Sequence, residues 1–124
     1  MTLKDAIVKF DTEYFNTIPD EIKIDWLSTL DSVIHQQIIS THQNPSPVSF
    51  DGYSEETPED TLLLVPEPFS DIYIRFLAMK KDLYLNDLSR YNNDLVMYST
   101  AFIEYKNFYN KNNMPLKKTS FFNA

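Results

Sequence analysis

A seam of mostly aromatic residues in the C-terminal half constrains the fold of this chain more than any other feature. Its members recur at alternating steps of four and three residues, the spacing that keeps one stripe of a helix facing a neighbouring helix. The pattern predicts that the segment from Pro68 to Asn112 is helical. The seam consists of Tyr84, Leu88, Tyr91, Leu95, Tyr98, Phe102, Tyr105 and Tyr109.

This predicted helical segment is too long to remain straight in a compact domain. At about 1.5 Å per residue its length would be roughly 68 Å, whereas a compact domain of this size has a radius of gyration near 14 Å. A polar run, Tyr91 to Asp94, interrupts the segment. We therefore expect the helix to bend near Asn92 or to project towards another molecule.

Two further helices are predicted before this segment. Thr2 is a candidate N-cap for the first helix, whose apolar residues recur at helical spacing as far as Tyr14. Pro19 begins the second helix, and acidic residues follow it, as the positive end of a helix prefers. The second helix should end near His42. The fold class predicted from these patterns is mainly α, a small bundle of three to four helices.

The stretch from 43 to 61 is predicted to be a loop, because prolines, serines and the single glycine of the chain punctuate it. No Lys or Arg occurs between Lys23 and Arg75, so one face of the folded chain should be negative. Two short runs, Val48 to Tyr53 and Leu62 to Val65, are compatible with a β-hairpin in this acidic loop. The acidic residues of the loop are Asp51, Glu55, Glu56, Glu59 and Asp60.

The composition excludes several classes of function. Eighteen acidic residues against eleven basic ones give a formal net charge of −7, which opposes a fixed groove for nucleic-acid phosphates. The absence of cysteine excludes disulfides and thiolate zinc sites, and a single glycine excludes glycine-rich phosphate loops. No apolar run reaches the ~18 residues of a membrane span. We therefore expect a soluble protein with neither membrane contact nor sequence-specific binding of nucleic acid.

No catalytic or metal-binding arrangement is evident from the residue spacing. His35 and His42 lie two helical turns apart, roughly 10.5 Å along the axis, too far to bind one metal ion. The loop carboxylates lack the alternating spacing of an EF-hand, and no serine lies in a strand-to-helix nucleophile turn. We therefore predict that the protein is not an enzyme and needs no cofactor.

The chain closes with a basic segment that follows Pro115 and ends in two phenylalanines. One interpretation is a disordered terminus. The other is an anchor whose rings enter a pocket on a partner while its lysines meet acidic groups. We predict one helical domain, 1–115, and a tail, 116–124, that is flexible or docked on a partner. The candidate partner-contacting residues are Lys117, Lys118, Phe121 and Phe122 in the tail and Tyr98, Phe102, Tyr105 and Tyr109 in the seam.

Four segments in a fixed order carry a resemblance to a known family: Asp25 to Asp31, Leu63 to Phe69, Arg90 to Asn93, and Tyr105 to Pro115. In this order the chain resembles the small helical head-tail connector proteins of long-tailed bacteriophages, also called head-completion or adaptor proteins. The resemblance implies a ring of roughly a dozen copies that docks on the portal protein and offers its other face to a tail-side stopper or completion protein. It also implies a location at the head-tail interface of the virion, after synthesis in the cytoplasm of the bacterial host.

Two hypotheses for function follow from the sequence. In the first, the protein is a virion assembly component whose surplus aromatic residues contact neighbouring subunits. The acidic loop would then border a DNA channel, where repulsion keeps the duplex from sticking. In the second, the protein is a small non-catalytic helical regulator that binds one protein partner through the aromatic seam.

Overall fold

The computed structural model describes residues 1–42 and 49–113. In these ranges the chain forms α1 (Leu3–Glu13), α2 (Asp20–Ile34), α3 (Asp71–Tyr84) and α4 (Leu88–Asn112), and a π-helical turn, η1 (His35–Ile39), extends α2. The prediction of a mainly α bundle is confirmed. The tail residues Lys117, Lys118, Phe121 and Phe122 lie outside the described residues.

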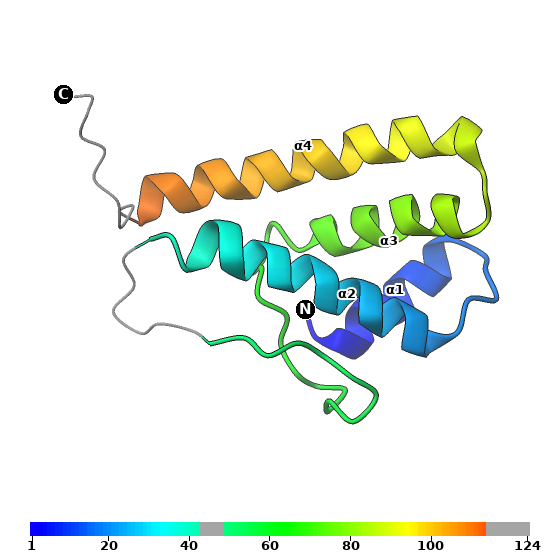
Figure 1. The fold of residues 1–124 in the computed structure, drawn as a ribbon, viewed down its shortest axis with the longest axis horizontal. Coiled ribbons are helices and arrows are strands. Elements are labelled where there is room, and N and C mark those ends of the chain that lie inside the picture. The colour runs from blue at the N-terminus through cyan, green and yellow to red at the C-terminus, as the bar shows by residue number, and fades with distance from the viewer. Residues whose placement is uncertain (43–48, 114–124) are drawn as a thin grey trace.

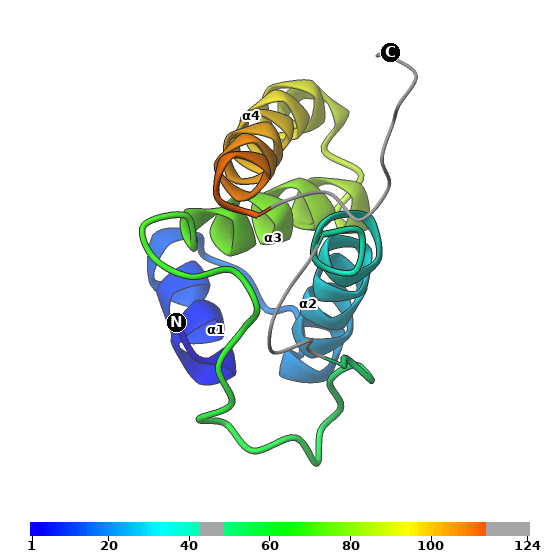
Figure 2. The same cartoon turned by 90° about the vertical axis from the view of Figure 1, so that its left-hand side faces the viewer.

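The helix α3 is the centre of the bundle. It contacts α1, α2 and α4, and its buried residues face all three. Figure 2 shows α4 on one side of α3, with α1 and α2 on the other, so the helices lie in three layers. The core lies between these layers, and its fully buried residues include Phe10, Leu27, Leu30, Ile34, Ile72 and Leu77.

The first helix begins where the sequence predicts, because Thr2 and Asp5 form a capping box. The Thr2 hydroxyl accepts a hydrogen bond from the Asp5 N–H, and the Asp5 carboxylate accepts one from the Thr2 N–H, both at 3.1 Å. Each bond satisfies a backbone donor that the helix itself leaves free. The hydrogen bond to the Thr2 N–H also lowers the pKa of the Asp5 carboxyl.

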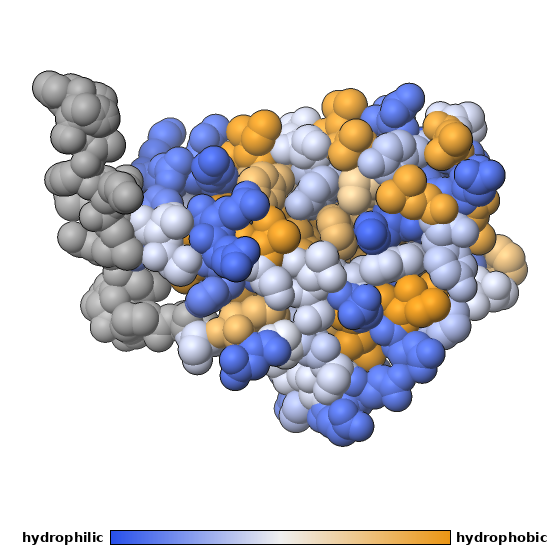
Figure 3. Space-filling view, in the orientation of Figure 1, coloured by the Kyte–Doolittle hydropathy of each residue, from blue (hydrophilic) through white to orange (hydrophobic). Residues whose placement is uncertain are grey.

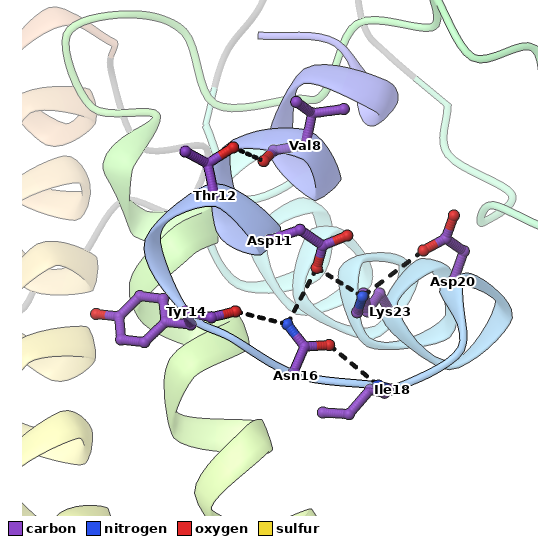
Figure 4. Close-up of polar contacts among 8 residues, drawn as sticks. All are labelled: Val8, Asp11, Thr12, Tyr14, Asn16, Ile18, Asp20 and Lys23. Carbon is purple, nitrogen blue, oxygen red and sulfur yellow. Dashed lines mark hydrogen bonds and ion pairs between the residues drawn. The ribbon is translucent and has the colours of Figure 1, made fainter.

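The corner between α1 and α2 is fixed by polar side chains (Figure 4). The Lys23 ammonium is almost fully buried and lies 2.6 Å from Asp11 and 3.6 Å from Asp20. The Asn16 amide donates to the Asp11 carboxylate and accepts from the Ile18 N–H. A buried charge is tolerated only with such partners, so the corner holds α1 against α2 in one orientation.

The long C-terminal run breaks at residues 85–87, and the prediction of a bend near Asn92 is wrong. Asn86 has a φ of 58°, a left-handed conformation that asparagine adopts more readily than most residues. The Asp87 N–H then donates to the Asp82 carbonyl at 2.7 Å. The chain reverses, and α4 packs antiparallel to α3 (Figure 1), with Asn92 inside a continuous helix.

The predicted hairpin is also absent from the described part of the loop, where residues 49–53 form no strand. Leu62 instead forms a single antiparallel bridge with Thr2. The Leu3 N–H donates to the Thr61 carbonyl at 2.9 Å, and the Leu63 N–H donates to the Met1 carbonyl at 3.1 Å. The start of α1 therefore takes the backbone hydrogen bonds that a hairpin partner would have used.

Candidate protein-interaction surface

The C-terminal end of the aromatic seam is part of the core. Tyr105 is only 2% exposed, and its ring centroid lies 5.7 Å from that of Phe69. Tyr109 is 9% exposed and packs edge-on against His42 at 5.0 Å. Burial raises the pKa of Tyr105 to about 12. Little of either ring is therefore left for the partner contact that the sequence predicts, because Phe69 and His42 already pack against Tyr105 and Tyr109.

The middle of the seam is half-buried. Tyr98 packs against Phe76 of α3 at 5.1 Å and against Phe102 at 6.1 Å between ring centroids. Burial raises the pKa of Tyr98 to about 12. Both Tyr98 and Phe102 keep part of their surface accessible, so their contact with a partner stays a prediction.

The N-terminal end of the seam lies at the chain reversal and is largely exposed. Tyr84 is 51% exposed and Leu88 is 60% exposed, and the adjacent Leu83 and Leu85 are exposed as well. The Tyr84 ring contacts Trp26 edge-on at 5.9 Å. This apolar turn lies at the same end of the molecule as the α1–α2 corner (Figure 1).

A second exposed surface runs along α4 on the side away from α3. Figure 3, with α4 along its upper edge, shows hydrophobic residues reaching the surface there. Every exposed side chain between Tyr91 and Glu104 is uncharged, and Val96 and Ile103 are 60% and 54% exposed. Sequence analysis missed this surface because the aromatic seam dominates the periodicity. The α4 outer face, as we call it, consists of Asn92, Asn93, Val96, Met97, Thr100 and Ile103.

The acidic loop places all five of its predicted carboxylates in solvent. Asp51, Glu55, Glu56, Glu59 and Asp60 are exposed. The Glu21 carboxyl of α2, within hydrogen-bonding reach, raises the pKa of Glu55. The loop therefore concentrates negative charge beside α1 and α2, as the distribution of charge along the sequence predicts.

The loop is attached to α2 through Asp31, a buried carboxylate that sequence analysis did not single out. Its oxygens accept hydrogen bonds from the Tyr53 hydroxyl at 2.5 Å, the Tyr73 hydroxyl at 2.7 Å and the Leu64 N–H at 3.1 Å. Burial raises the pKa of Asp31, and the hydrogen bonds oppose this rise. Its position one residue after Leu30, on the apolar stripe of α2, was a signal that it would be buried.

A second buried carboxylate, Asp82, lies where α3 meets α4. Among the described residues neither of its side-chain oxygens accepts a hydrogen bond, and the Lys81 ammonium is 3.5 Å away. Its other close neighbour is the Asp94 carboxyl of α4. Burial, with Asp94 adding to it, raises the pKa of Asp82 to about 6.

Each of the two histidine rings contacts other parts of the chain. His42 connects η1 to α4, because its Nδ1 lies 2.6 Å from the Ile38 carbonyl and its Nε2 lies 2.6 Å from the Asn110 side-chain oxygen. The ring of His35 lies 6.4 Å from that of Phe50. Across the described ranges, no cluster of three His, Asp or Glu side chains could hold a metal ion.

Searches for related proteins do not place the chain in a family. No family model, no curated protein sequence and no solved structure matches it. In residues 1–42 and 49–113 no helix is both long and apolar enough to cross a membrane. The geometry of the exposed surfaces and the order of segments in the sequence are therefore what bear on function.

Proposed function

We propose that this protein is a non-catalytic virion assembly component, a head-tail connector subunit of a long-tailed bacteriophage. In this proposal copies of the chain form a ring on the portal protein and link the DNA-filled head to the tail. The α4 outer face is the observation that carries the proposal. Its support from the sequence is the order of segments by which the chain resembles connector proteins.

The α4 outer face has the composition of a protein contact. Interface cores are depleted of charged residues, whereas ordinary exposed helix faces are rich in them. This chain carries a formal net charge of −7, yet the α4 outer face contributes no charge over about three turns. It is therefore a surface on which two like-charged subunits can meet with little repulsion.

The exposed acidic loop supports the same proposal. A negative surface beside a DNA channel repels the duplex and lets it slide without binding. The loop carboxylates that would provide this repulsion are Asp51, Glu55, Glu56, Glu59 and Asp60.

The proposal is tested by mixing the protein with the portal protein of the same genome and examining the product by light scattering and electron microscopy. We expect a closed ring of the chain on the portal. The double variant Val96→Glu/Ile103→Glu should keep the free energy of unfolding within about 0.5 kcal/mol of the wild type, because both residues are exposed, but should lose the ring.

A matched control adds the same two charges elsewhere. Gln36→Glu/Gln37→Glu changes two exposed residues of η1 and should still form the ring. Monomers that ignore the cognate portal would overturn the proposal. A defined one-to-one complex with another protein would favour the alternative of a helical regulator.

A further inference from the structure

A cleft opens between α1, the start of α2 and the acidic loop. Its volume is about 190 Å³, smaller than the roughly 300 Å³ or more of sites for small-molecule ligands. It therefore suits one or two side chains of a protein segment. The cleft has an apolar floor that includes Ile7, Val8 and Ile24. Val8 remains 52% exposed at this floor.

The walls of the cleft are acidic. Four carboxylates line it, of which Asp11 and Asp20 already contact the Lys23 ammonium and Glu59 lies 3.6 Å from the Lys4 ammonium. Glu55 already lies against another carboxyl, that of Glu21, so a cation arriving here would relieve repulsion between like charges. The four lining carboxylates are Asp11, Asp20, Glu55 and Glu59.

This chemistry matches one segment of the same chain. The tail from 114 to 124 contains Lys117 and Lys118, followed by Phe121 and Phe122, which pair cations with aromatic rings as the cleft pairs carboxylates with an apolar floor. The other pair of adjacent lysines after Arg75, Lys80 and Lys81, is followed directly by Asp82, whereas Lys117 and Lys118 have no acidic neighbour in the sequence. Its length of eleven residues gives a reach of at most about 40 Å.

We propose that the cleft binds the C-terminal tail of a neighbouring copy of this chain, with the phenylalanine rings on the apolar floor and the lysines at the acidic walls. The tail follows α4, and the cleft is formed by α1, α2 and the loop on the opposite side of α3 (Figure 2). In each copy, α4, which the tail follows in sequence, and the cleft thus lie on opposite sides of α3. Contacts of this head-to-tail kind repeat, and they close into a ring when the rotation between successive subunits allows it. The inference rests on the proposed function, because it names a second contact, beside the α4 outer face, that would link ring subunits.

The direct test uses a fluorescent peptide with the sequence of residues 114–124 and the full chain carrying Phe121→Ala/Phe122→Ala, which leaves the cleft free of its own tail. Anisotropy should show saturable binding that weakens as salt is raised. Adding Glu55→Lys to this chain should weaken binding roughly fivefold to tenfold. The matched control Glu104→Lys, an exposed charge reversal on α4, should leave binding unchanged.

A charge exchange and a mixing experiment complete the test. The peptide with Lys117→Glu/Lys118→Glu should bind the Glu55→Lys chain better than it binds the chain with native Glu55. An equimolar mixture of the Phe121→Ala/Phe122→Ala chain and the Glu55→Lys chain should form heterodimers in sedimentation velocity, because one supplies the cleft and the other the tail.

Three outcomes would overturn the inference: no peptide binding, equal binding to the Glu55→Lys and Glu104→Lys chains, or a mixture that stays monomeric because each tail occupies its own cleft. Failure here is distinct from failure of the proposed function. If the Phe121→Ala/Phe122→Ala chain still forms a ring on the portal, the tail contact is refuted and the connector role stands.

Discussion

The two buried aspartates of this protein differ in their hydrogen bonding. Asp31 and Asp82 are both fully enclosed, and burial raises the pKa of each. Asp31 accepts three hydrogen bonds and so connects α2, α3 and the loop. Asp82 faces another carboxyl and one lysine. The buried carboxylate therefore stabilises the fold at Asp31, where three donors satisfy it, and destabilises the fold at Asp82, where no hydrogen-bond donor among the described residues does.

The largest expected difference between the two sites comes from deleting the carboxylates. Asp31→Ala should lower the free energy of unfolding by about 3 to 5 kcal/mol, because two tyrosine hydroxyls and the Leu64 N–H lose their acceptor together. Asp82→Ala should lower it by at most about 1 kcal/mol, since among the described residues only the contact with Lys81 is lost and no hydrogen bond. Urea unfolding of the two variants at pH 7 measures both values. Equal losses would refute the contrast between the sites.

Asp82 should contribute strongly to the pH dependence of stability, alongside Asp31, whose pKa is also raised. The pKa of Asp82 in the folded chain, about 6, exceeds the ordinary value of 3.8, so the folded state binds more protons between these values. Stability should therefore fall as pH rises from about 4 to about 6, by roughly 2 to 3 kcal/mol for this group. Asp82→Asn removes the titration and should be more stable than the wild type at pH 7.

The control for this prediction is Asp60→Asn, which changes an exposed loop carboxylate and should leave the pH profile of the wild type intact. Asp94→Asn should also flatten the profile, because the amide cannot repel Asp82 and can donate to it. If Asp82→Asn follows the wild type throughout pH 4 to 7, the prediction that Asp82 has a raised pKa is wrong.

The two tyrosines whose hydroxyls donate to Asp31 should contribute unequally to the free energy of unfolding. The Tyr73 hydroxyl donates to Asp31 and also accepts the Val65 N–H at 2.7 Å, so Tyr73→Phe leaves a buried backbone donor unpaired and should cost about 2 to 3 kcal/mol. Tyr53→Phe removes one bond from a half-buried residue and should cost about 1 kcal/mol. Thermal unfolding followed by circular dichroism compares them, and a larger loss for Tyr53→Phe would contradict the geometry.

Local signals in the sequence were sufficient for the first two helices. The Thr2 cap, Pro19 and the apolar spacing act within a few residues, so α1 and α2 follow from them directly. The chain reversal was not predictable in this way. The spacing of the seam is the same on both sides of Asn86, and its left-handed conformation leaves no mark on the periodicity. The polar run at Asn92 remains helical because its side chains lie at the surface.

The contacts of the candidate site depend on parts of the chain that are distant in sequence. Periodicity identifies Tyr105 as a member of a stripe, but which elements cover it depends on how α4 folds back onto α3. Asp31 meets hydroxyl donors that lie 22 and 42 residues further along the chain. A residue pattern can indicate that a polar group is buried, whereas its partners emerge only from the packed helices. The exposure of the acidic loop carboxylates, by contrast, was predictable from the sequence, because an exposed charge needs no partner from elsewhere in the chain.

The smallest expected effect tests how tightly the loop is held to the Asp31 site. Gly52 has a φ of 95°, and a Cβ added there would lie 2.9 Å from the Ser28 hydroxyl, which accepts the Tyr53 N–H. Gly52→Ala should therefore cost about 1 kcal/mol through backbone strain and this close approach. In the Ser28→Ala background the close approach disappears and only the strain remains, so the cost of Gly52→Ala should be smaller there. Equal costs in both backgrounds, measured by urea unfolding, would show that the Ser28 hydroxyl moves aside freely and does not fix the loop.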